Sequence, residues 1–255
     1  MKLEEHQESG IRCTASSRHI AVMFASIVLG GCSVHATRID VADHRTFLPA
    51  LRAGVNLNEG KLAASELQTG HAIEAGIAKA NGGNSQYLLS SQSPITLNNT
   101  TFTGPQQLRN DFDFYFADLS WRWRKFFLER SLGMETFAGI GYTSLGLKIS
   151  SPSQHASERF ANWGPQGGAG LIWRFSSNSC FQARIARFIS PGHDGVSNIF
   201  RREAFYAKAL DDNITLRAGY AAWIVEGQQN WYNNSDFQLR FEGPVLALDM
   251  NFNER

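Results

Sequence analysis

The stretch Ile214-Thr-Leu-Arg-Ala-Gly-Tyr-Ala-Ala-Trp-Ile224 decides the fold class, because its apolar side chains recur at every second residue. Successive side chains of a β-strand point to opposite faces of a sheet, so this period predicts a strand with two differently solvated faces. The same period recurs at Phe112-Asp-Phe-Tyr-Phe116, Leu119-Ser-Trp-Arg-Trp123 and Phe237-Gln-Leu-Arg-Phe241. We therefore expect an all-β protein.

Working outward from this stretch, the period predicts eight strands whose connections alternate between long and short. The predicted strands cover 69–80, 109–124, 132–149, 163–175, 180–189, 201–210, 213–227 and 235–252. Long connections are expected at 81–108, 150–162 and 190–200, and a medium one at 227–235. Strands of this length with alternating connections are typical of a closed antiparallel transmembrane β-barrel.

Two features of the pattern affect the strand count and register. The apolar parity changes between residues 116 and 119 and again at Gly243-Pro244, which predicts a β-bulge at each place. Residues 47–57 also alternate, but a ninth strand breaks the antiparallel parity, so they are placed outside the barrel wall. Ten strands result if 235–252 divides at Gly243-Pro244.

Composition excludes several functional classes. The 24 basic and 23 acidic side chains nearly cancel, so a basic face for nucleic acid is not expected. No apolar run reaches the roughly 18–20 residues of a spanning helix. The three cysteines have no metal-ligand spacing, and we expect neither a metal nor a cofactor.

The N-terminal residues have the features of an export signal. Arg18 and His19 precede the ten-residue apolar run Ile20–Leu29, which Gly30-Gly31-Cys32 follows. Leu29-Gly-Gly-Cys32 resembles a lipobox, which implies a lipoprotein signal peptide at 1–31 and lipidation of Cys32. Cleavage after Ala36 is the alternative. The expected organisation is then a tether and periplasmic segment at 32–68 and a barrel domain at 69–252.

On its strand pattern and loop alternation, the region 69–252 resembles the small eight-stranded outer-membrane barrels of the OmpA and OmpX kind. The resemblance implies residence in the outer membrane of a Gram-negative bacterium, lipid as a partner, and both chain ends in the periplasm. Val245–Phe252 also resembles the terminal signal read by the barrel-assembly machinery, although Ala247 stands where that pattern has Gly and three residues follow the final Phe.

If the apolar faces meet lipid, a set of charged side chains points into the barrel lumen. This set comprises Arg122, Arg124, Arg174, Arg184, Arg217, Arg240 and Asp249. Side chains fill a barrel of eight strands, and buried charges must pair. We therefore expect a salt-bridged, plugged lumen, with a narrow ion path as the alternative. Trp121, Trp123, Phe126, Phe127, Trp173 and Phe175 are expected to form an interfacial aromatic belt.

A hydrolytic site is the other hypothesis. His193, Ser197 and Glu203 are candidates for base, nucleophile and orienting acid. The segment 193–198 resembles the His-x-Ser-Asn motif of PagL-like lipid A deacylases, but the His–Ser spacing is four residues instead of two. The favoured expectation is a non-enzymatic structural or surface-interaction protein. The alternatives are a lipid A-modifying hydrolase and a soluble periplasmic lipid-binding barrel.

Overall fold

The structure is a computed structural model that describes residues 46–57, 70–92, 94–127, 131–191, 195–211, 213–229 and 235–251. These residues form two sheets and no helix, so no helix in the described part is long and apolar enough to cross a membrane. The predicted all-β class is confirmed. The predicted signal peptide, including Cys32 and Ala36, lies outside the described residues.

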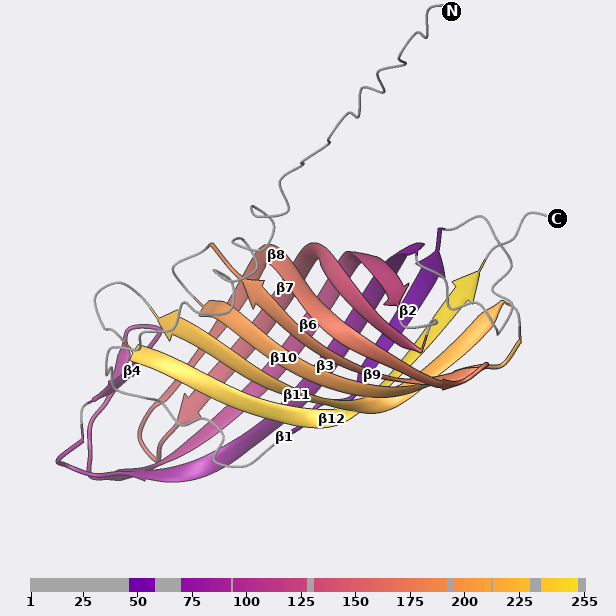
Figure 1. The fold of residues 1–255 in the computed structure, drawn as a ribbon. Helices are drawn as coiled ribbons and strands as arrows, with labels where there is room; N and C mark the ends of the chain where they lie inside the picture. The colour runs from indigo at the N-terminus through magenta and orange to yellow at the C-terminus, as the bar shows by residue number, and fades with distance from the viewer. Residues whose placement is uncertain are drawn as a thin grey trace, which may run out of the picture. The chain divides into compact units, whose positions relative to one another are not determined.

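The larger sheet contains ten strands and closes into a ring (Figure 1). Its strands are β1 (Thr46–Phe47), β2 (Ala50–Asn56), β3 (Gly70–Leu88), β6 (Gln106–Phe127), β7 (Leu132–Ser150), β8 (His155–Ser176), β9 (Ser179–Ile189), β10 (Gly195–Ala209), β11 (Ile214–Gln229) and β12 (Ser235–Asn251). From β3 to β12 each long strand pairs antiparallel with the next one in this list. Figure 1 shows these strands tilted and curved around a common axis.

The ring is closed by the segment that was expected to lie outside the wall. β2 pairs antiparallel with β3 and parallel with β12, and β1 continues the same parallel line along β12. The prediction of eight wall strands beginning near residue 69 was therefore wrong. The parity argument failed because it assumed that every neighbouring pair is antiparallel. The extra strands come from residues 46–56, since 235–251 does not divide.

The ring has a short-turn end and a long-loop end. At the short-turn end lie the connections β6–β7, β8–β9 and β10–β11, while β3–β6, β7–β8, β9–β10 and β11–β12 are joined at the long-loop end. The strands extend further than the period predicted, and only Ser151–Gln154 separate β7 from β8. The β3–β6 connection carries a small hairpin of β4 (Ile95–Leu97) and β5 (Thr100–Phe102), joined by Asn98 and Asn99 at positive φ.

Neither predicted bulge is present. In β6 the even-numbered side chains point inward along the whole strand, first Phe112, Phe114 and Phe116, and then Asp118 and Arg122. In β12 Leu239, Phe241 and Asp249 all point inward, and pairing with β11 continues through Gly243 and Pro244 without a shift. The strands keep one parity, and it is the ring interior that changes along the axis from apolar to charged.

The ring interior is therefore layered. Towards the long-loop end it is filled by a large apolar core, which includes the aromatic residues Phe112, Phe114, Phe116, Phe188, Trp223 and Phe241. The side chains of Ile95, Leu97 and Phe102 from the small hairpin are buried in the same core. A layer of buried charges follows, and near the short-turn end Ile172, Cys180 and Ala207 form a second small apolar cluster.

Candidate functional site

The charged layer of the ring interior is the densest group of functional side chains in the described residues. We call it the charge layer and define it by its eleven buried ionic members, Arg52, Glu74, Asp118, Arg122, Arg124, Glu135, Arg184, Arg201, Glu203, Arg217 and Asp249. Every strand from β2 to β12 in the ring supplies a member except β8, which supplies Gln166. The layer therefore connects side chains from all the strands of the ring except β1.

Glu74 on β3 lies at the centre of the charge layer. Its carboxylate accepts hydrogen bonds from Arg52 Nη1 at 3.1 Å, Arg122 Nη1 at 2.6 Å and Arg184 Nη2 at 2.9 Å. Arg217 Nη2 donates to the same carboxylate. Four arginines from four other strands thus share one acidic group.

The other carboxylates connect the remaining arginines. Asp249 Oδ1 contacts Arg122 and Arg217 at 3.2 Å and 3.1 Å. The other pairs are Glu135 with Arg124 and Arg184, Glu203 with Arg52 and Arg184, Asp118 with Arg52 and Arg201, and Asp249 with Arg124 at 3.8 Å. Each carboxylate of the layer thus contacts at least two arginines. Such contacts are needed because a charge removed from water must be compensated by neighbouring charges and hydrogen bonds.

At the border with the apolar core, aromatic rings complete the layer. Arg201 lies over the rings of Phe116 and Trp223, with its guanidinium carbon 5.0 Å and 4.9 Å from the ring centroids. Gln166 Nε2 donates to Asp118 Oδ2 at 2.7 Å, and Gln166 Oε1 accepts from Arg201 at 2.9 Å. These contacts hold the guanidinium of Arg201 in a fixed orientation and fill the space between the walls.

The structure places the predicted lumen residues in different positions. The side chains of Arg122, Arg124, Arg184, Arg217 and Asp249 are buried in the charge layer. Arg174 lies nearer the short-turn end, half-buried, with its guanidinium 4.9 Å from the centroid of Phe126. Phe126 is therefore turned inward and does not join the predicted outer belt.

Arg240 is the clear correction in that set. It is exposed on the outer face of β12, where its guanidinium lies 3.4 Å from Gln238 Oε1. The expectation assumed that Leu239 and Phe241 face outward, but both are buried in the apolar core. The period of two correctly placed Arg240 on the opposite face from Leu239 and Phe241, but the prediction of which face is inside was wrong.

The predicted hydrolytic residues are not brought together where the structure describes them. Ser197 lies at the start of β10 beside a register shift, and its hydroxyl donates to the backbone oxygen of Glu226 at 3.3 Å. Glu203 is buried in the charge layer and accepts from Arg52 at 2.9 Å. Six residues of one strand separate the two, roughly 20 Å. His193 lies outside the described residues.

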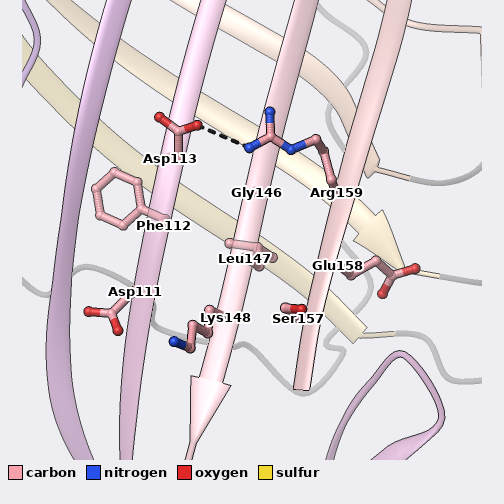
Figure 2. Close-up of a pocket in the computed structure, with 9 residues that line it drawn as sticks. All are labelled: Asp111, Phe112, Asp113, Gly146, Leu147, Lys148, Ser157, Glu158 and Arg159. Atoms are coloured by element: carbon pink, nitrogen blue, oxygen red, sulfur yellow. Dashed lines mark hydrogen bonds and ion pairs between the residues drawn. The ribbon is translucent and has the colours of Figure 1, made fainter. Parts of the chain in front are cut away.

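The outer face of the ring carries a pocket of about 560 Å³ between β6, β7 and β8 (Figure 2). Gly146 leaves the floor open, and Asp113 and Arg159 approach each other across it at 3.4 Å. Both side chains are well exposed, and Asp111, Lys148 and Glu158 give the lining a mixed charge. The pocket is therefore a solvated part of the outer wall with a mixed-charge lining.

The outer face also carries large apolar side chains, which we call the apolar band. It includes Leu51, Ile73, Ile77, Leu119, Trp121, Ile140, Trp163, Leu171, Trp173, Phe175, Phe181, Ile185, Leu216, Tyr220 and Leu246, each at least 39% exposed. At the short-turn side, Trp173, Phe175, Phe181 and Tyr206 form an aromatic cluster in which contacting rings have centroids 5.1–6.3 Å apart. At the other side Tyr142 contacts Trp163, with 4.8 Å between the ring centroids.

No group of three or more His, Cys, Asp or Glu side chains that could hold a metal ion occurs among the described residues. Cys180, the one cysteine in the described part, is buried and makes no disulfide. Comparison with models of known protein families, with curated proteins and with solved structures found no match to this chain.

Proposed function

We propose that this chain is an integral protein of the Gram-negative outer membrane. In this proposal it is a β-barrel without catalytic activity that has a structural or surface-interaction role and a side-chain-filled lumen. The observation that carries the proposal is the pairing of the apolar band on the outside of the ring with the charge layer on the inside.

This arrangement of polarity fits hydrocarbon around the ring. A closed sheet in water normally buries its apolar face inside and turns its charges outward, whereas the described ring does the reverse over its charged section. Exposed apolar surface is stabilised when hydrocarbon covers it, by roughly 1.5–3 kcal/mol for each large side chain that becomes fully buried. A patch that runs around the ring is far larger than monomeric soluble proteins expose.

The length of the apolar band agrees with a bilayer. On β8 the outward positions run from Trp163 through Ala169 and Leu171 to Trp173, an eleven-residue segment with tryptophan at both ends. On β6 they run over nine residues from Tyr115 to Trp123. A strand crosses the hydrocarbon core in about 9–11 residues, and aromatic side chains concentrate at both interfaces.

Beyond the band, towards the long-loop end, the polarity is that of a water-soluble sheet. The outer face there carries Lys79, Asp111, Lys148 and Arg159, and the interior is the apolar core. We place this end outside the cell, so that the ring projects from the membrane and offers its loops and polar wall for contact. The short-turn end is then periplasmic, as short turns are in outer-membrane barrels.

The partners in this proposal are outer-membrane lipid along the band and the barrel-assembly machinery during insertion. The final strand β12 supplies the alternating outward residues Leu246, Leu248 and Met250 for that machinery to recognise. Neither alternative function has comparable support. The candidate hydrolytic side chains Ser197 and Glu203 are held apart, and the apolar interior that a lipid-binding barrel needs is packed with buried aromatic side chains.

The proposal is tested by producing the full-length chain in a Gram-negative host and fractionating the envelope. We expect the protein in the outer-membrane fraction, resistant to alkaline extraction, dependent on detergent for solubility, and faster in gel electrophoresis unheated than boiled. A folded protein that stays in solution without detergent would refute the membrane barrel. A change in lipid A acylation on expression, seen by mass spectrometry, would restore the hydrolase hypothesis.

A further inference from the structure

The charge layer has more positive than negative groups among the described residues. It contains six arginines and five carboxylates, and each of their side chains is at most 10% exposed. Arginine does not lose its proton in proteins, so the excess cannot be removed by deprotonation. One positive charge in the interior therefore needs a compensating group.

The unused hydrogen-bonding atoms show where the excess lies. Among the arginines of the charge layer, the buried donors with neither a hydrogen bond nor an ion pair are Arg52 Nε, Arg122 Nε, and Arg217 Nε and Nη1. Arg124 Nη2 and Arg184 Nε also lack a hydrogen bond, but they lie in ion pairs with Asp249 and Glu135. The two side chains are close, because Arg122 and Arg217 both contact Glu74 Oε2 and Asp249 Oδ1. Three of these four donor atoms therefore belong to two neighbouring guanidinium groups.

The distribution of the carboxylates gives the same location. On the side of the apolar core, Arg52 and Arg201 lie beside Asp118 and Glu203, and two ion pairs, Arg52 with Glu74 and Arg184 with Glu203, join this side to the rest. The rest of the layer comprises four arginines, Arg122, Arg124, Arg184 and Arg217, with three carboxylates, Glu74, Glu135 and Asp249. The uncompensated charge and three of the four unpaired donors thus occur in the same half of the layer.

We propose that the charge layer binds a small monovalent anion of the halide class beside Arg122 and Arg217. One anion of this kind neutralises the excess and accepts the unpaired N–H groups. A single charge matches the count, whereas a divalent oxyanion would reverse the imbalance. The site concerns the ring interior, so it does not depend on whether the ring spans a membrane.

The site is tested by following urea unfolding of the full-length folded protein against chloride, with gluconate replacing chloride at constant ionic strength. A ligand that binds only the folded state raises the folding equilibrium constant by a factor of one plus its concentration over its dissociation constant, about 100-fold at 100 times that constant. We expect a saturable increase of this form for the unmodified chain.

Two substitutions make the test specific. Gln182 lies on the inner face of β9 between Cys180 and Arg184, and its side chain is buried. Gln182→Glu supplies a sixth carboxylate of nearly the same shape, so its stability should no longer depend on chloride. The matched control Arg202→Gln changes an exposed arginine on the outer face of β10 and should keep the full dependence.

Bromide locates the anion directly. Crystals soaked in bromide should give an anomalous peak within hydrogen-bonding distance of the Arg122 or Arg217 guanidinium. Unfolding that is indifferent to chloride, or a bromide peak only elsewhere on the molecule (an adventitious ion only), overturns the proposal. If the protein proves soluble without detergent, the same measurements made in buffer decide the anion site independently of the membrane proposal.

Discussion

Glu74 has more ion-pair partners than any other described residue of the interior. Its two carboxylate oxygens serve Arg52, Arg122, Arg184 and Arg217, so its negative charge compensates groups on four other strands. None of these arginines can turn to water when the carboxylate is lost, because all are buried. The stability of the ring should therefore depend strongly on this one side chain.

We predict that Glu74→Gln lowers the free energy of unfolding by about 3–5 kcal/mol, since removing one partner leaves buried charge uncompensated. The matched control is Asp113→Asn, whose carboxylate pairs with Arg159 at an exposed position and should cost less than about 1 kcal/mol. Urea unfolding of the detergent-solubilised variants measures both. Equal losses for the two variants would show that the charge layer is not strongly coupled.

At the residue scale the sequence predicted part of the candidate site. The period of two identified Arg122, Arg124, Arg184, Arg217 and Asp249 as sharing faces opposite apolar side chains. It did not identify Arg52, because residues 47–57 were placed outside the wall. It also could not show that Glu74 meets Arg217, since contacts across the ring depend on strand stagger, which a one-dimensional pattern does not contain.

At the element scale, β6 shows why a bulge was predicted where the strand is regular. A strict period states which side chains share a face, but it does not state which face is inside. Along β6 the inner side chains change from Phe112 and Phe114 to Asp118 and Arg122, and the outer ones change from Asp113 to Leu119. When the inner side chains change from apolar to charged and the outer ones from charged to apolar, the sequence pattern looks the same as a shift of register by one residue.

The closing strand β2 is the element with the most direct test. Leu51 on β2 lies opposite Ile77 on β3 in antiparallel register, and both side chains are exposed on the outer face. Directly opposite residues have Cβ atoms about 4.5–5.5 Å apart, near disulfide geometry. We predict that Leu51→Cys with Ile77→Cys, in an otherwise cysteine-free chain, forms a disulfide detectable by gel mobility with and without reductant.

The control for this cross-link shifts one partner by two residues. Ala53→Cys with Ile77→Cys keeps both thiols on the outer face but places them on a diagonal of roughly 7–8 Å, which is too long for efficient oxidation. Cross-linking of the shifted pair and not of the direct pair would show a different register. Cross-linking of neither pair would return residues 46–56 to a position outside the wall.

At the scale of the whole molecule, the two polarity zones of the outer face should differ in their tolerance of charge. Ala169 lies midway between Trp163 and Trp173 on the outer face of β8, and Ser157 lies on the same face towards the long-loop end. Arginine at the bilayer midplane costs about 2–4 kcal/mol and little at the interface or beyond it. We predict that Ala169→Arg lowers stability in lipid vesicles by that amount, while Ser157→Arg stays within about 1 kcal/mol of the parent.

The difference in stability between Ala169→Arg and Ser157→Arg should disappear if water, and not hydrocarbon, surrounds the ring. If the apolar band faces water, arginine at residue 169 is no less favourable than arginine at residue 157, and both variants should unfold like the parent. Reversible unfolding from vesicles in urea provides the comparison. A larger loss for Ser157→Arg would move the bilayer towards the long-loop end.

The tryptophans give the position of the molecule along the membrane normal. Ten residues of β8 separate Trp163 from Trp173, about 33 Å along the strand and about 23 Å along the normal at a tilt of about 45°. We therefore predict that both lie near opposite edges of the hydrocarbon. In variants that keep only one tryptophan, lipid bromine near the headgroup should quench either residue more strongly than bromine at the chain ends.

Trp223 is buried in the apolar core and serves as the control, since neither lipid should quench it strongly. Stronger quenching of Trp163 and Trp173 from the chain ends would place the apolar band differently in the bilayer, and no quenching at all would mean that lipid does not surround the ring.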